Sequence, residues 1–129
     1  MRLDRARLEK GVFPFSYQMA TRYSDTDKLS HVNNVAVADL LQEGRNRFIH
    51  AIGLMSAVRG WDLVVGGAYT EFAGELFHPE PVEIFVGVLE VGRSSFRFGE
   101  IIKQGGRTAI YAEVVQVARD AGGPAVGLP

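Results

Sequence analysis

The chain has 129 residues, the usual size of one domain and enough to bury a core. Fourteen lysines and arginines against fifteen aspartates and glutamates leave a formal charge of −1, so composition favours neither a nucleic-acid nor an acidic-membrane partner. The absence of cysteine excludes disulfides, thiolate metal sites and a cysteine nucleophile. We therefore expect one cytoplasmic domain over residues 1–129 without a membrane span, in which residues 1–12 form an N-terminal segment.

The first strand is predicted where apolar and polar side chains alternate, between residues 13 and 24. This pattern places one set of side chains on the buried face: Phe13, Phe15, Tyr17, Met19, Thr21 and Tyr23. A polar segment from Asp25 to Asn34 follows, without a hydrophobic period of its own.

The long helix is predicted between residues 37 and 52, where apolar residues recur at steps of three and four. Asn33 or Asn34 suits its N-cap, and Gly53 suits its C-cap. Gly44 lies inside the helix, where glycine costs about 1 kcal/mol relative to alanine. We therefore expect Gly44 to permit a close contact between the helix and the rest of the fold.

Four more strands are predicted after the helix, and short glycine-containing turns join the last three into hairpins. They cover Leu63–Phe72, Val82–Val91, Ser95–Lys103 and Thr108–Arg119. The pair Gly66-Gly67 predicts a bulge or bend in the first of these. The strand Val82–Val91 is nearly apolar throughout, so we expect it to be central and covered on both faces. Residues 120–129 are expected to form an irregular tail.

This order of elements predicts an α+β fold, an antiparallel five-stranded sheet wrapped around one long helix. One helix cannot cover both faces of five strands. We therefore expect a second subunit to cover the remaining apolar surface, which predicts a homodimer or a homotetramer.

The polar segment before the helix is the candidate site, because Asp25, Asp27 and His31 lead directly into a helix N-terminus. The first helical turn offers unpaired N–H groups and a partial positive charge that can polarise a carbonyl. A carboxylate beside it can act as a base or nucleophile, and a histidine can move a proton. The same residue types also cap helices and form turns, so composition alone leaves both interpretations open.

The run YSDTDKLSHVNN, followed by LLQEGRNRF, resembles the hotdog-fold thioesterases of the 4-hydroxybenzoyl-CoA thioesterase type. Its HVNN portion is similar to the acyl-ACP thioesterase branch, and the resemblance covers nearly the whole chain. It implies a hotdog fold and hydrolysis of an acyl-CoA or acyl-carrier-protein thioester. The resemblance implies no cofactor, because coenzyme A or phosphopantetheine is then part of the substrate.

The resemblance assigns the catalytic role to Asp27, with His31 as an auxiliary proton carrier. Glu43 lies on the helix where several members of the family carry an acidic residue implicated in catalysis, so it is a further catalytic candidate. Asp25 is expected to be structural and to bond loop amides. Substrate contacts are expected from Asn33, Asn34, Val35 and Arg93, of which Arg93 would meet a coenzyme A phosphate. Glu43 also stands four residues before Arg47, a spacing at which the two could simply pair on the surface. The three histidines show no metal-binding spacing, so no metal site is expected.

Three positions depart from the family pattern. Leu29 stands where the acyl-ACP branch has a catalytic asparagine, Ser30 replaces a common glycine, and Val37 replaces a common aromatic residue. Two other hypotheses stay open, the first because of the asparagine that is missing at Leu29 and the second because hotdog hydratases also pair a histidine with a carboxylate. One is a non-catalytic dimer that binds acyl thioesters or is purely structural, and the other is a hotdog hydratase or dehydratase.

Overall fold

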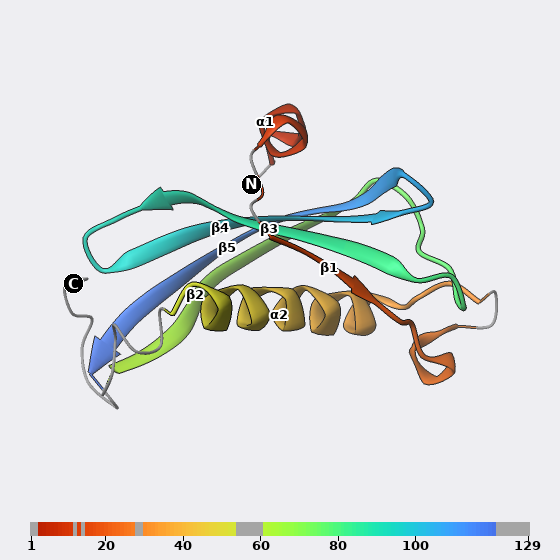
Figure 1. Cartoon of the computed structure of the whole chain (residues 1–129), viewed down its shortest axis with the longest axis horizontal. Helices are drawn as coiled ribbons and strands as arrows, with labels where there is room; N and C mark the ends of the chain where they lie inside the picture. The colour runs from red at the N-terminus through yellow and green to blue at the C-terminus, as the bar shows by residue number, and fades with distance from the viewer. Residues whose placement is uncertain (1–2, 12, 14, 28–29, 54–60, 121–129) are drawn as a thin grey trace.

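The computed structural model describes residues 3–11, 13, 15–27, 30–53 and 61–120. The elements in chain order are α1 (Arg5–Lys10), β1 (Phe15–Met19), the 3-10 turn η1 (Tyr23–Asp25), α2 (Asn34–Ala51), β2 (Trp61–Phe72), β3 (Val82–Val91), β4 (Ser95–Gln104) and β5 (Arg107–Asp120). The strands form one antiparallel sheet in the order β1-β3-β4-β5-β2, and the sheet curves over α2 (Figure 1). The predicted α+β architecture is confirmed. The predicted tail, except Asp120, and Leu29 lie outside the described residues.

Helix α2 packs one apolar side against the inner face of the sheet. Its buried side chains belong to the same cluster as buried residues of β3, β4 and β5, among them Val37, Leu41, Phe48, Ile84, Val86, Phe98 and Ile110. Asn33 caps the helix, because its Oδ1 accepts the Ala36 N–H at 2.9 Å. Gly53 follows the last turn with a left-handed φ of 72°. Both predicted helix ends are therefore confirmed.

Gly44 lies at a close contact between α2 and the sheet, as predicted. A Cβ atom at this position would stand 2.8 Å from Cγ2 of Ile84 and 3.2 Å from Oε2 of Glu100. The neighbouring Arg45 donates to Oε1 of Glu100 at 3.0 Å, and Glu100 is fully buried. Burial raises the pKa of the Glu100 carboxyl to about 8, against the opposing effect of Arg45. A polar pair is thus enclosed between α2 and β4.

The centre of the sheet is β4, and not the Val82–Val91 strand for which we predicted that place. The first strand of the chain pairs antiparallel with β3 and takes the edge, which moves β3 one position from the centre. Cover on both faces was predicted correctly only for part of β3. Val82, Ile84 and Val86 are fully buried on the α2 side, and Phe85 and Leu89 pack against the cluster of Leu8 on the other side. Val91, at the far end of the strand, is exposed.

Helix α1 lies on the outer face of the sheet, opposite α2 (Figure 1), and the sequence pattern did not predict it. Its Leu8 is fully buried and packs in one cluster with Leu3 and Ile101, flanked by Phe85, Leu89 and other partly buried residues. Asp4 caps the helix by accepting the Arg7 N–H at 3.1 Å. The outer face therefore has apolar cover from its own chain, so less of it needs a second subunit than we expected.

Strand β1 is shorter than the predicted strand at residues 13–24. It ends at Met19, and the chain then turns into η1, where Tyr23 is 83% exposed instead of lying on the buried face. The turn forms because Arg22 and Asp25 bond across it, including a hydrogen bond from the Arg22 N–H to the Asp25 carboxylate at 3.3 Å. This local bonding overrides the period-two pattern.

Strands β2, β4 and β5 agree with their predicted ranges to within a few residues. The pairing of β2 with β5 shifts register between Val65 and Gly67, which confirms the predicted bulge. β2 is an edge strand, and its Val65, Tyr69 and Phe72 are exposed. Within the described residues, neither helix is long and apolar enough to cross a membrane.

Candidate active site

The polar segment before α2 forms a loop that backbone hydrogen bonds tie together. The Asp27 N–H donates to the His31 carbonyl at 2.9 Å, and the Asn33 N–H donates to the Asp25 carbonyl at 2.8 Å. Ser30 has a left-handed φ of 62°, a conformation that glycine adopts without cost and other residues do not. The family that this sequence resembles commonly has glycine at this position. Ser30 therefore adopts a backbone conformation that favours glycine.

His31 lies between two carboxylates. Its Nδ1 is 3.9 Å from Oδ2 of Asp27 and 3.7 Å from Oε2 of Glu75. Its backbone N–H donates to Oδ1 of Asp27 at 3.1 Å, and its ring packs edge-on against Phe77 with centroids 5.0 Å apart. The structure thus brings the predicted pair Asp27 and His31 together and adds Glu75 to it.

Gln104 fixes the segment that carries Glu75 and Phe77. Its buried side-chain amide donates to the carbonyls of Phe77 at 2.7 Å and Glu80 at 2.8 Å, and its Oε1 accepts the Phe77 N–H at 2.8 Å. Phe77 and His31 also form an isolated antiparallel β-bridge through their backbones. The end of β4 therefore positions the loop after β2, and that loop positions the imidazole.

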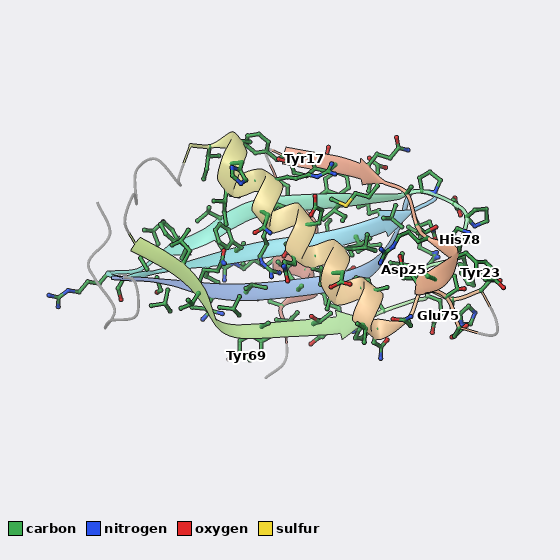
Figure 2. The ribbon with its side chains drawn as sticks, turned by 90° about the horizontal axis from the view of Figure 1, so that it is seen from below. Tyr17, Tyr23, Asp25, Tyr69, Glu75 and His78 are labelled. Atoms are coloured by element: carbon green, nitrogen blue, oxygen red, sulfur yellow. The ribbon has the colours of Figure 1, made fainter. Side chains whose placement is uncertain are left out.

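Asp25 has the structural role that we expected, since it accepts the Arg22 backbone N–H, and the Arg22 guanidinium is a further partner that the sequence did not predict. Arg22 donates to the Asp25 carboxylate from Nη2 at 2.7 Å and from Nε at 3.0 Å. The hydrogen bonds from Arg22 hold the pKa of the Asp25 carboxyl below its usual range. His78, whose Nδ1 is 2.7 Å from Oγ1 of Thr21, lies at the same end of the molecule as Asp25, Tyr23 and Glu75 (Figure 2).

A cavity of about 600 Å³ opens at the start of α2. Its lining joins the polar loop to the first helical turn and comprises Arg22, Ser24, Asp25, Asp27, Val32, Asn33, Asn34, Val35, Ala36, Asp39 and Glu75. Asn33 accepts the Ala36 N–H with its side chain and the Val37 N–H with its carbonyl. The N–H groups of Asn34 and Val35 remain the donors of this turn without an acceptor among the described residues. A carbonyl oxygen placed there would meet these donors, with Asp27 lining the same space.

Glu43 lines a different cavity, of about 390 Å³, along the side of α2. Its Oε1 accepts a hydrogen bond from Nε of Arg47 at 3.1 Å, so the two form the surface pair that their spacing allows. The helix carboxylate that lines the cavity of Asp27 is instead Asp39.

Arg93 lies at the opposite end of the sheet from the polar loop. Met19, the last residue of β1 before that loop, pairs with Val82 at the start of β3, whereas Arg93 follows the end of β3. Within one chain the structure therefore does not bring Arg93 next to Asp27.

Sequence reasoning missed Glu75, Gln104 and Asp39. Glu75 and Gln104 approach the polar loop only through the pairing of distant strands, and no local pattern marks them. The position of Glu75 just beyond the predicted strand at residues 63–72 was the one signal available. Asp39 carried a helical signal, but its spacing alone did not distinguish it from Glu43. No group of three or more possible metal ligands occurs in the described part of the chain.

A family model described as the thioesterase-like superfamily matches residues 21–128, which include the polar loop, α2 and all later strands. The chain belongs to this superfamily. A protein of Aquifex aeolicus (strain VF5), named "Putative esterase", is 25% identical over 127 residues, which cover 83% of this chain and 99% of that protein.

Solved thioesterase-like structures share the fold. A thioesterase of Thermus thermophilus, solved in complex with coenzyme A and Zn, is 26% identical with a TM-score of 0.79, and the match covers 92% of this chain and 93% of that one. A "Probable Thioesterase" of Bartonella henselae has a TM-score of 0.81 at 20% identity, covering 89% and 98% of the two chains. The hotdog thioesterase fold, implied by the sequence resemblance, is thereby confirmed.

Proposed function

We propose that this protein hydrolyses acyl thioesters, with Asp27 as the catalytic carboxylate. One observation carries the proposal, namely that Asp27 and the first turn of α2 line the same cavity. A thioester carbonyl placed against the N–H groups of Asn34 and Val35 would be polarised by them and by the helix dipole. Membership of the thioesterase-like superfamily supports the reaction class.

In this reaction water adds to the thioester carbonyl carbon, the C–S bond breaks, and a carboxylic acid and a thiol are released. Asp27 takes the proton of the attacking water, or attacks the carbon itself to form an anhydride that water then opens. His31, held beside Asp27 and Glu75, delivers a proton to the departing sulfur. Asn33 caps α2 by accepting the N–H groups of Ala36 and Val37, which leaves those of Asn34 and Val35 available to the substrate oxygen.

Coenzyme A thioesters are the substrates that we propose first. The Thermus thermophilus relative was solved with coenzyme A, and it shares the fold over nearly its whole length. Acyl-carrier-protein thioesters carry the same phosphopantetheine arm and form the parallel test.

We also propose that the active form is a homodimer, alone or as half of a tetramer. β2 is a 12-residue edge strand with exposed Val65, Tyr69 and Phe72. Among the described residues β2 pairs on one side only, and a long edge strand with exposed apolar side chains is a template for a second chain. Sedimentation at micromolar concentration should give a dimer or tetramer, and a folded, active monomer would contradict this assembly.

The reaction is tested with a panel of acyl-CoAs and acyl-carrier proteins and a free-thiol readout, using wild type and Asp27→Asn. Thiol release by wild type that is lost in Asp27→Asn supports the proposal. No thiol release from any thioester would overturn it. Water addition to an unsaturated acyl group without thiol release would identify a hydratase instead.

A further inference from the structure

The two cavities beside α2 are neighbours, because they share four lining residues: Arg22, Asp25, Ala36 and Asp39. The first cavity holds Asp27 and the start of the helix. The second continues along the helix side and is lined in part by Met19 and Leu40, which are apolar. An acyl group whose carbonyl lies at the first turn of α2 therefore extends past the shared residues toward this apolar part.

Asp39 is the shared residue with an available charge. Arg22 and Asp25, the two other charged residues that line both cavities, neutralise each other through two guanidinium hydrogen bonds. Glu43 in the second cavity bonds to Arg47. The side chain of Asp39 is exposed and makes no hydrogen bond or ion pair within the described part of the chain. The pKa of Arg22 is raised mainly by its bonds to Asp25 and least by the charge of Asp39. The Asp39 carboxylate would therefore meet a bound acyl group without a bonded counter-charge.

The position of Asp39 on α2 fits contact with the acyl group rather than with the reacting carbonyl. Asp39 is four residues beyond Val35, which places it on the same side of the helix and about 6 Å further along the axis at 1.5 Å per residue. The carbon chain of a glutaryl group spans most of that length. A charged group at the end of such a chain would thus lie close to Asp39.

We propose that Asp39 selects the acyl group by charge, so that the site accepts uncharged or cationic acyl groups and disfavours those that end in a carboxylate. This inference rests on the proposed function of the same site. Two carboxylates several ångströms apart in a partly screened cleft repel each other enough to lower kcat/KM by about five- to tenfold. The same field attracts a cation.

The test uses three coenzyme A thioesters that differ mainly in terminal charge: glutaryl-CoA (anionic), 5-oxohexanoyl-CoA (neutral) and 4-trimethylammoniobutanoyl-CoA (cationic). Wild type should favour the neutral over the anionic substrate, and the preference should shrink at high salt. Asp39→Asn should raise the anionic-to-neutral ratio of kcat/KM by about five- to tenfold and lower the cationic-to-neutral ratio. Asp39→Glu should keep the wild-type order, because it keeps the charge.

Glu83→Gln is the matched control, since it removes an exposed carboxylate of β3 that lines neither cavity. Its ratios should equal those of wild type. Asp39→Asn with wild-type ratios, or with all three rates changed equally, would overturn the inference. If no thioester is cleaved, calorimetric affinities for the same three compounds replace kcat/KM. Affinities that show the expected charge preference would then contradict only the proposed hydrolysis. Affinities without that preference would contradict both the hydrolysis and the charge selection by Asp39.

Discussion

The first turn of α2 and the body of the same helix lie in different surroundings. The first turn opens onto a cavity of about 600 Å³ lined by carboxylates and amides. The body buries one side against the sheet, where Phe48 packs edge-on against Phe15 at 5.1 Å and Phe98 at 5.8 Å between centroids. One helix thus supports chemistry at its start and stability along its length. Substitutions in the two regions should therefore affect different quantities.

Asp27→Asn is the sharpest test of this division and should have the largest effect. Asparagine keeps an oxygen to accept the His31 N–H but loses the charge and the basicity. Turnover should fall by about 10²–10⁴, the usual contribution of a positioned acid–base group, while the melting temperature changes little. Steady-state kinetics and thermal unfolding measure the two quantities.

Asp25→Asn is the control for Asp27→Asn, because it breaks the bond to Arg22 and should lower stability more than turnover. Wild-type turnover in Asp27→Asn, together with loss of turnover in Glu43→Gln, would show that Glu43 and not Asp27 is the catalytic carboxylate.

The contact between the helix body and β4 should make the stability of the protein depend on pH, through the Glu100 carboxyl that Arg45 of α2 bonds. Glu100 has a folded-state pKa of about 8, above its ordinary value of 4.5, because it is buried. The stability from its bound proton is fully present below the unfolded pKa and is lost as the pH rises through the folded pKa, by at most about 1.4 kcal/mol per pH unit.

Urea unfolding of wild type and Glu100→Gln between the ordinary pKa of 4.5 and the folded-state pKa of about 8 isolates the effect of the Glu100 carboxyl. The substitution should flatten the decline, whereas Glu83→Gln, an exposed carboxylate, should leave it unchanged. An equal slope in wild type and Glu100→Gln would show that Glu100 does not titrate in this window.

Glu75→Gln should affect chemistry, because Glu75 is one of the two carboxylates beside Nδ1 of His31. We expect kcat to fall by about tenfold, less than the full contribution of an acid–base group, since Asp27 remains next to the ring. Glu80→Gln, an exposed carboxylate in the same loop, should leave kcat unchanged. Unaltered kcat in Glu75→Gln would mean that His31 depends on Asp27 alone.

Gly44→Ala should lower stability and leave catalysis intact. The new methyl group would crowd Ile84, which is fully buried. Overpacking costs about 1–3 kcal/mol, and the higher helix propensity of alanine returns about 1 kcal/mol, so a net loss of about 1 kcal/mol is expected. Asn46→Ala, at an exposed position of the same helix, should instead stabilise slightly. Gly44→Ala at wild-type stability would show that Ile84 can move aside.

Ser30→Gly should give the smallest effect, a gain in stability. Its left-handed φ costs serine about 1–2 kcal/mol, of which the greater freedom of unfolded glycine cancels about 0.5–1 kcal/mol. A net gain of about 0.5 kcal/mol should appear in chemical unfolding. A loss of stability would indicate that the serine side chain supports the loop.

The sequence by itself determined the elements whose signals are local. The bounds of α2 follow from its apolar period, the Asn33 cap and Gly53, all within a few residues of the bonds that they make. The meander of β3, β4 and β5 follows from strand patterns and intervening turns, and the bulge in β2 follows from its glycine pair. Asp27 and His31 are close because His31 follows Asp27 by only four positions in one loop.

Only the tertiary structure decided what depends on contacts between distant segments. It placed β4 at the sheet centre, packed α1 on the outer face, and turned Tyr23 outward. It also brought Glu75 to His31, and it placed Asp39, but not Glu43, in the lining of the cavity that holds Asp27. Periodicity shows that a segment has a buried side but not which segment covers it, because that choice depends on strand pairing and packing across the whole chain.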